Sequence, residues 1–252
     1  MTSGLGLFLT LTLGLFILFG SAIVFLMKNG DRLVNFSIGM ALGVMSALGI
    51  LELFPEALEH LEETSIGNPI IILIAMTIVG IAFLKLLDKF IPDHDLENHS
   101  EKEVNENLHH IGLVSSIALV LHNVIEGMAI YSTVTTNSKL GLFMCIGVGL
   151  HNIPLGMVIT STFYKYNKSI KKTLLASTLI SLSTFLGGVI MCLVSNMITP
   201  LLLGILLSIT LGMIIYIVIF ELIPHVKEEI QDKTVWVGII IGICILLISQ
   251  LF

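Results

Sequence analysis

The sequence predicts an all-α polytopic membrane protein with eight transmembrane helices. Of its 252 residues, 55% are hydrophobic and only 12% are charged, whereas a soluble domain carries about 25% charged residues. So few charged side chains leave too little polar surface to cover a protein in water. The apolar stretches are about 20 residues long, the length of a helix that crosses a bilayer. We therefore expect residues 1–252 to form a single transmembrane domain in a cell membrane.

Eight apolar segments are long enough to cross the bilayer, and polar or charged residues separate most of them. The first segment begins close to the N-terminus and ends at Lys28, and Arg32 precedes the second. An acidic stretch at 56–63 follows the second and a long polar stretch at 91–110 follows the third. Lysines follow the fourth, fifth and seventh. The expected spans are residues 5–27, 33–54, 70–90, 111–134, 140–163, 173–196, 200–224 and 234–252.

The basic residues lie almost entirely on alternate connections. Eleven of the 12 fall within or beside the first, third, fifth and seventh connections, and the exception is Lys139, after the fourth span. Because lysine and arginine accumulate on cytoplasmic loops, we expect these four connections in the cytoplasm and both termini outside. The eleven residues are Lys28, Arg32, Lys85, Lys89, Lys102, Lys165, Lys168, Lys171, Lys172, Lys227 and Lys233.

The polar stretch 91–110 is expected to be a histidine-containing cytoplasmic loop. One interpretation is a solvated, largely disordered linker, because the stretch is rich in charged and polar residues. The other is a low-affinity collector of metal ions, because imidazole and carboxylate groups suit divalent cations. Its histidines are His94, His99, His109 and His110.

The second and seventh spans match each other at an offset of 169 residues. On the orientation above these two spans run in opposite directions, so the sequences ELFP at 52–55 and ELIP at 221–224 face opposite sides. This pattern predicts an inverted repeat of helices 1–3 and 6–8, which is typical of secondary transporters with a central site. The matching residues are Leu42, Gly43, Glu52, Leu53, Pro55 and Glu59, which align with Leu211, Gly212, Glu221, Leu222, Pro224 and Glu228.

The two central spans carry a repeated polar motif. LHNVIEGMAI at 121–130 aligns with LHNIPLGMVI at 150–159. His122, Asn123 and Glu126 lie about eleven residues into the fourth span, and His151 and Asn152 lie at the same depth in the fifth. At about 1.5 Å per residue, both groups reach the middle of the membrane.

These five polar side chains are candidates for a metal site. An ionisable group in hydrocarbon costs about 2.5–3.5 kcal/mol, so it needs a partner or a function. Two imidazoles and one carboxylate suit zinc and related divalent ions, and the asparagines can offer amide oxygens or orient the ligands. The alternative is that the side chains only join two helices by hydrogen bonds. The three cysteines lie within apolar segments, so no disulfide framework or thiolate cluster is expected.

Two further glutamates, Glu52 and Glu221, are expected near opposite ends of their helices. Each alone is an ordinary interfacial carboxylate in contact with water. Because they are symmetric about the central site, they are also candidates for entry and exit ligands.

The motifs HNVIEG at 122–127 and HNIPLG at 151–156 resemble the paired signatures of the ZIP (Zrt/Irt-like protein) family of metal transporters. Residues 39–59 and 211–224 resemble the second and seventh helices of that family. The resemblance implies uptake of zinc, or of iron, manganese or cadmium, toward the cytoplasm. It also implies a 3+2+3 arrangement of helices, a possible homodimer, and movement of one helix bundle against another.

The family's central helices hold two metal ions, and this chain departs from that pattern. By position, His122, Glu126 and His151 match ligands of one ion, while Asn123 and Asn152 match the side that faces the second. Leu155 stands where the fifth helix usually offers a carboxylate, and Thr184 stands where the sixth helix carries a glutamate. We therefore expect one ion site rather than two.

The leading functional hypothesis is a divalent-metal transporter whose partners are metal ions and the lipid bilayer. The alternative is a degenerate relative that binds or senses metal without transport. An enzyme that uses a zinc-bound water is not expected, because the sequence contains no HExxH motif. No prosthetic group and no nucleic-acid partner are expected.

Overall fold

The computed structural model describes residues 2–27, 30–64, 66–89, 101–194 and 199–252. Within these ranges the regular structure is helical and no strand is present. The helices are α1 (Thr2–Met27), α2 (Gly30–Leu48), the π-helical turn η1 (Gly49–Leu53), α3 (Phe54–Glu62), α4 (Pro69–Asp88), α5 (Glu101–Thr136), α6 (Ser138–Asn167), α7 (Ile170–Val194), α8 (Pro200–Tyr216), the π-helical turn η3 (Ile217–Leu222), α9 (Ile223–Glu228) and α10 (Lys233–Ser249).

The all-α membrane class is confirmed. Seven described helices are long and apolar enough to cross a bilayer, and α10, with 17 residues, is at the short end of the range for a spanning helix. Side chains cap the starts of α4, α6, α8 and α10 by accepting hydrogen bonds from backbone amides near each start. These caps are Asn68, Asn137, Thr199 and Asp232.

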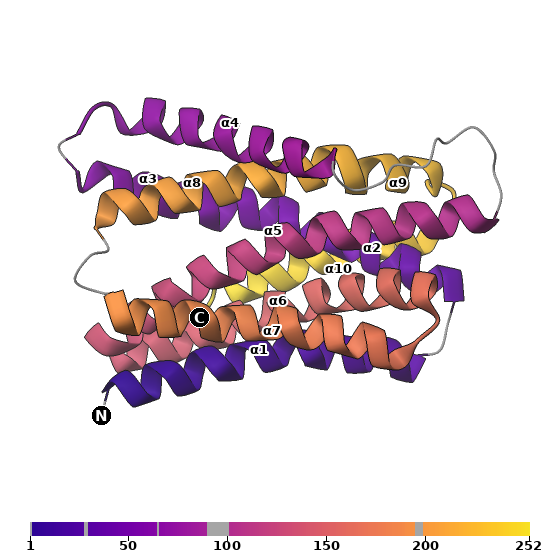
Figure 1. The fold of residues 1–252 in the computed structure, drawn as a ribbon, viewed down its shortest axis with the longest axis horizontal. Coiled ribbons are helices and arrows are strands. Elements are labelled where there is room, and N and C mark those ends of the chain that lie inside the picture. Colours follow the sequence, from indigo (N-terminus) through magenta and orange to yellow (C-terminus); the bar gives the residue numbers. More distant parts are fainter. Residues whose placement is uncertain (1, 28–29, 65, 90–100, 195–198) are drawn as a thin grey trace.

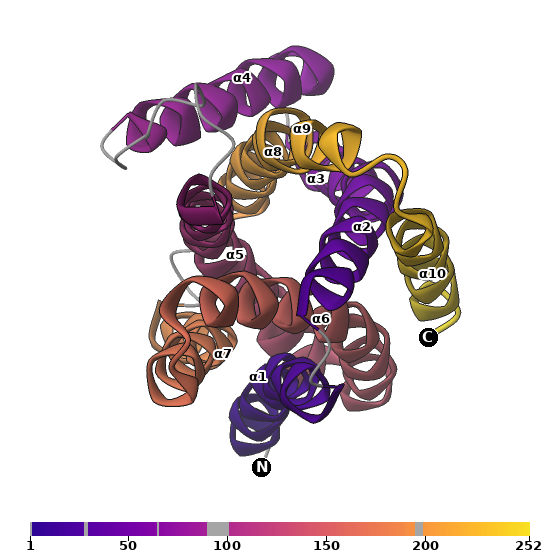
Figure 2. The same cartoon turned by 90° about the vertical axis from the view of Figure 1, so that its right-hand side faces the viewer.

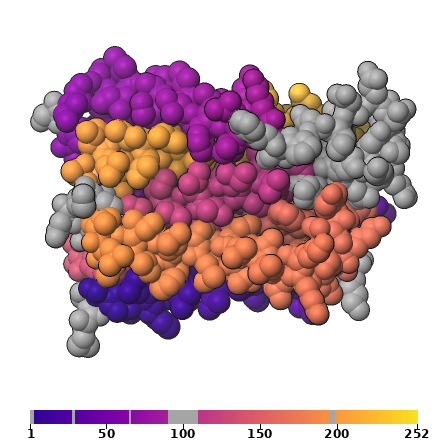
Figure 3. Space-filling view, viewed as in Figure 1, coloured from indigo at the N-terminus to yellow at the C-terminus, as the bar shows by residue number. Residues whose placement is uncertain are grey.

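The helices form two groups that lie side by side along the bundle. Helices α1, α5, α6 and α7 pack against one another, while α2 packs on α10 and α4 packs on α8 (Figures 1 and 2). On the face seen in Figure 3, α5 lies between α8 and α7. We call the first set the α5–α6 group and the second the α2–α8 group.

The two arms of the inverted repeat pack in matching ways. Gly43 in α2 faces the carbonyl of Ile239 in α10, and the corresponding Gly212 in α8 faces the carbonyl of Thr77 in α4. A Cβ atom at these glycines would lie 2.3 Å and 2.0 Å from the two carbonyl oxygens. Small residues allow helix backbones to approach this closely in membranes, so the glycine shared by the two repeats has the same structural role in both.

The second and seventh spans continue beyond the ends expected from the sequence. The helices pass through Pro55 and Pro224 and end at Glu62 and Glu228. A proline removes one helical hydrogen bond and clashes with the preceding turn. In both places a π-helical turn, which adds one residue to a turn, directly precedes the proline-containing helix. Glu52 and Glu221 therefore lie within long helices and not at their ends.

The fourth span begins earlier than expected. Helix α5 starts at Glu101, so residues 101–110 of the expected loop are helical and include His109 and His110. Glutamate, lysine and leucine in this stretch are good helix formers, and acidic residues favour the first turn of a helix. The expected collectors His94 and His99 lie outside the described residues.

The helices begin and end at two opposite ends of the bundle. At the end shown on the right of Figure 1, α1, α4 and α6 end while α2, α5, α7 and α10 begin. Within the described residues, this end carries basic residues of the odd-numbered connections, among them Lys89, Lys165 and Lys233, and we call it the lysine end. Large apolar side chains such as Phe8, Ile71, Leu175 and Ile240 are exposed along the sides of the bundle, as a lipid-facing surface requires.

Candidate metal centre

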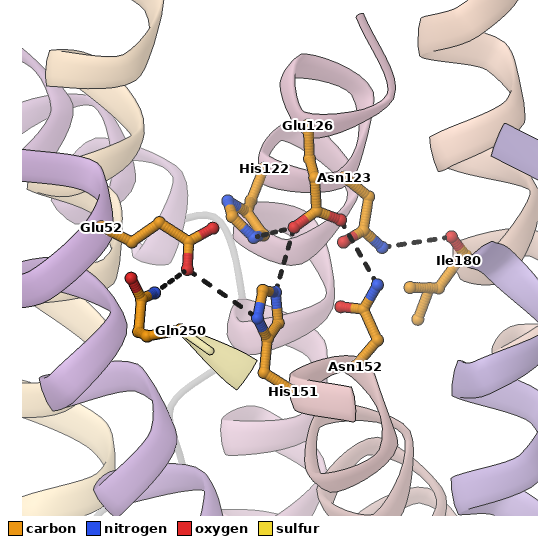
Figure 4. Close-up of polar contacts among 8 residues, drawn as sticks. All are labelled: Glu52, His122, Asn123, Glu126, His151, Asn152, Ile180 and Gln250. Atoms are coloured by element: carbon orange, nitrogen blue, oxygen red, sulfur yellow. Dashed lines mark hydrogen bonds and ion pairs between the residues drawn. The ribbon is translucent and has the colours of Figure 1, made fainter. Parts of the chain in front are cut away.

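The side chains of His122, Glu126 and His151 converge inside the bundle (Figure 4). Nε2 of His122 is 3.4 Å and Nε2 of His151 is 3.0 Å from the same oxygen, Oε1 of Glu126. The three residues are 2%, 8% and 0% exposed in chain order. Two imidazole nitrogens and one carboxylate oxygen thus lie within 4.8 Å of one another, close enough for one ion to bind all three.

Local sequence explains this convergence. His122 and Glu126 are four residues apart on α5 and share one face of the helix. Asn137 caps the start of α6, which runs back against α5, so the equal depth of the two motifs brings His151 opposite Glu126. Pro154 lies inside α6 without ending it, and it leaves one carbonyl of the preceding turn without its helical partner.

The two asparagines are fully buried and have different partners. Nδ2 of Asn152 donates a hydrogen bond of 3.3 Å to Oε2 of Glu126, and so orients the carboxylate. Nδ2 of Asn123 donates to the carbonyl oxygen of Ile180 in α7 at 3.5 Å. Within the described residues, the amide oxygens of both asparagines have no hydrogen-bond partner.

The two positions that depart from the family pattern are also buried. Leu155 is 1% exposed and belongs to the main apolar core. Thr184 is fully buried on α7, and its hydroxyl has no hydrogen-bond partner among the described residues. Neither side chain offers a carboxylate to a metal ion.

Glu52 lies beside the central cluster. Its Oε2 is 3.9 Å from Nδ1 of His151 and accepts a hydrogen bond of 3.0 Å from Nε2 of Gln250 (Figure 4). Nδ1 of His151 has no hydrogen-bond partner among the described residues. The imidazole of His151 therefore has Glu126 on one side and Glu52 on the other. Sequence reasoning missed both the proximity of Glu52 and the contribution of Gln250.

A cavity connects Glu52 with the end of the bundle opposite the lysine end. Its volume is about 390 Å³, and its lining includes Glu52, Glu56, Glu59 and Gln250. A narrower cavity lined by His122 and Glu126 also contains Glu52 and Glu56 in its lining. Carboxylates thus lead from this end of the bundle to the central cluster.

A second cluster lies nearer the lysine end. Nε2 of His110 is 2.9 Å from Oδ1 of Asp88, and Nδ1 of His110 is 3.3 Å from Oε2 of Glu221. The hydroxyl of Tyr216 donates a hydrogen bond of 2.6 Å to Oδ2 of Asp88. His110 precedes His122 by twelve residues on α5, which places the clusters about 18 Å apart along the helix. His110 and Glu221 were expected to be functional from the sequence, whereas Asp88 was not.

Comparisons with known proteins agree with these motifs. A family model described as "ZIP Zinc transporter" matches residues 91–250. A protein named "Zinc transporter ZupT" from Enterobacter sp. (strain 638) is 30% identical over 226 residues, which are 88% of this chain and 86% of that protein. Proteins of the same name from Shigella dysenteriae serotype 1 (strain Sd197) and Escherichia coli O127:H6 are 28% and 29% identical over 223 residues, 87% of this chain and 85% of theirs.

Proposed function

The chain belongs to the ZIP family of zinc transporters, and from this premise we propose that it carries zinc across the membrane toward the cytoplasm. Iron, manganese and cadmium accept the same ligand types and are further candidate substrates. Membership of a transporter family makes the protein a transporter and not an enzyme. The direction toward the cytoplasm is the one that the family resemblance implies, and the lysine distribution assigns the lysine end to the cytoplasm.

The observation that carries this proposal is the convergence of three buried ligand atoms from His122, Glu126 and His151. Zinc in proteins is held by imidazole nitrogen and carboxylate oxygen at about 2.0–2.2 Å, and sites that release or exchange a ligand keep one position open. Three protein ligands leave such a position. A site of this kind can accept an ion from one side and release it to the other.

We place the ion's path along the two repeat glutamates. Glu52 is the entry group, since it lies next to His151 and lines the cavity that opens toward the end opposite the lysine end. Glu221 is the exit group, together with Asp88 and His110. His110 belongs to the α5–α6 group, whereas Asp88 and Glu221 belong to the α2–α8 group. The contacts of His110 with Asp88 and Glu221 therefore join the two groups at the exit, and movement of one group against the other would break these contacts.

One ion at the centre fits the charges better than two. Glu126 and the neighbouring Glu52 together balance the charge of one divalent cation. A second ion would have only neutral amide and hydroxyl oxygens around it, because Leu155 and Thr184 replace the carboxylates. Desolvation of an unbalanced divalent ion is costly, so we propose a single tightly held ion per chain. Metal titration of the purified protein with an element count tests this, and two tightly held ions would overturn it.

Uptake into vesicles that contain the purified protein tests the main proposal. His122→Ala and Glu126→Ala should abolish zinc uptake, while Lys139→Gln, which changes a charge at the surface, serves as the matched control. Undiminished uptake by the histidine and glutamate variants would refute the proposed site. Saturable zinc binding by the wild type without any flux would instead identify a relative that binds or senses metal.

A further inference from the structure

A second kind of cavity lies at the lysine end of the bundle, away from both metal-binding clusters. Its volume is about 520 Å³, and it lies between the end of α1, the start of α2, the end of α6 and the start of α7. One wall is apolar and includes Val24, Leu33 and Val34, while the other includes Ser161, Lys165 and Lys168. The cavity is therefore amphipathic.

The depth of the cavity is that of the membrane–water boundary. Val24 is three residues from the end of α1, Leu33 is three residues from the start of α2, and Lys165 is two residues from the end of α6. All three are within about one turn of a helix end. A molecule in this cavity would have one part in water and the other beside the apolar helices.

The polar side of the cavity carries a net positive charge. Four lysines, Lys165, Lys168, Lys171 and Lys172, lie within eight residues, and the sequence has no aspartate or glutamate from 127 to 220. Within the described residues, the acidic partner of Lys165 is Asp31 of α2. The side chain of Asp31 is 78% exposed and that of Lys165 is 30% exposed, so water competes with this ion pair.

The backbone at Lys168 is a second, independent observation. Lys168 ends α6 with a φ of 50°, in the left-handed region, and its amide donates a hydrogen bond of 2.9 Å to the carbonyl of Tyr164. Glycine is the residue that best accepts this conformation at a helix end. A lysine here is less favourable for the backbone, and it places a cation on the wall of the cavity.

We propose that this cavity binds one anionic phospholipid, with its phosphate between Lys165 and Lys168 and part of an acyl chain along Val24, Leu33 and Val34. Basic pockets between transmembrane helices bind anionic headgroups by the same combination of charge and apolar contact. The phosphate would compete with Asp31 for Lys165. Because Asp31 belongs to the α2–α8 group and Lys165 to the α5–α6 group, the lipid would loosen one contact between the two groups. This inference does not depend on which ion the protein carries.

The test measures the lipid that remains bound to the purified full-length chain after extraction from vesicles of phosphatidylglycerol and phosphatidylcholine in equal amounts. Mass spectrometry gives the ratio of the two lipids. The wild-type protein should retain more phosphatidylglycerol than phosphatidylcholine. Each lysine near the membrane surface contributes about fivefold to binding of an anionic lipid, so Lys165→Gln with Lys168→Gln should lower this preference about thirtyfold.

Three variants separate a specific cavity from general surface charge. Lys171→Gln with Lys172→Gln removes the same charge beside the cavity, and it should preserve most of the preference. Val34→Trp fills the apolar side while it keeps every lysine, and it should reduce retention of both lipids. Lys168→Gly should lower the preference about fivefold without lowering the melting temperature, since glycine suits that backbone position.

Two results would overturn the proposal. An equal loss of the preference for phosphatidylglycerol in the two double-lysine variants would mean that lipid binding depends only on surface charge. Full retention of both lipids by Val34→Trp would mean that no acyl chain lies in the cavity. A further arm adds excess inorganic phosphate to the wild-type protein. If phosphate alone raises the melting temperature as much as phosphatidylglycerol does, the site takes a free anion and the lipid assignment is wrong.

Discussion

Glu52→Gln is expected to weaken zinc binding at the centre, although Glu52 is not among the three converging ligands. Oε2 of Glu52 is 3.9 Å from Nδ1 of His151, and the ion would lie beyond Nε2 on the other side of the same ring. The ring width and a zinc–nitrogen bond of about 2.1 Å put the carboxylate about 8 Å from the ion. The substitution removes one negative charge and keeps the size of the side chain.

The magnitude follows from that distance. A divalent ion and a single charge about 8 Å apart attract by about 4 kcal/mol at an effective dielectric constant of about 20, and by about 1 kcal/mol in water. The side chain of Glu52 is 23% exposed, so a value of about 2 kcal/mol is appropriate. This corresponds to about a thirtyfold increase in Kd, within the range of about 10–100-fold found for residues that orient a metal ligand.

Competition with a fluorescent zinc chelator measures this Kd on the purified protein. Glu59→Gln is the matched control. Glu59 lines the same cavity of about 390 Å³ as Glu52, but its carboxylate is not paired with His151. This substitution should leave the Kd close to that of wild type. An unchanged Kd in Glu52→Gln, or equal losses in both variants, would refute the reasoning. Slower uptake with an unchanged Kd would refute it as well, because Glu52 would then act only at entry.

Leu155→Glu adds a carboxylate where the family usually has one, and it should raise the element count from one zinc per chain to two; a count that stays at one would contradict this. Gly43→Ala and Gly212→Ala should each lower the melting temperature, because the new Cβ would meet a carbonyl oxygen, whereas Gly4→Ala meets nothing within 4 Å and should not. Asp232→Ala removes the cap of α10, which is worth about 1 kcal/mol. A hydrogen bond donated by a backbone amide at the start of α10 holds the pKa of Asp232 below its usual value. The stabilisation by this cap is therefore present above an unfolded pKa of about 3.9 and is lost as the pH falls through the lower folded value. The difference in melting temperature from wild type should therefore shrink in acid, and a constant difference across a pH series would contradict this assignment.

The parts of the fold and site that the sequence predicts are those fixed by local spacing. Eight helices follow from apolar stretches of spanning length, and seven described helices together with the shorter α10 match them. The central cluster follows from a spacing of four residues between His122 and Glu126 and from the equal depth of His151. Both inferences need only helix geometry and the thickness of the bilayer.

The parts that sequence reasoning missed depend on contacts between distant elements. Pro55 suggests the end of a helix, but the π-helical turn before it lets the helix continue and keeps Glu52 beside His151. Asp88 is one aspartate at the end of a helix, and nothing local shows that Glu221 and His110 lie near it. The composition around His110 resembles a linker, whereas the helix it belongs to places it between those two carboxylates.

The two repeat glutamates occupy equivalent positions but have unlike neighbours, and this difference bears on which end of the path is open. Glu52 accepts a hydrogen bond from a neutral amide and lines a cavity of about 390 Å³ with other carboxylates. Glu221 contacts His110, which also contacts Asp88. A cation that arrives from the side of Glu52 needs to displace only the amide of Gln250, whereas one that arrives at Glu221 must displace an imidazole held by two carboxylates. On the path we propose, alternating access requires one end to close while the other is open. The structure would then correspond to the state that receives the ion at Glu52, and release would require the contacts of His110 to break.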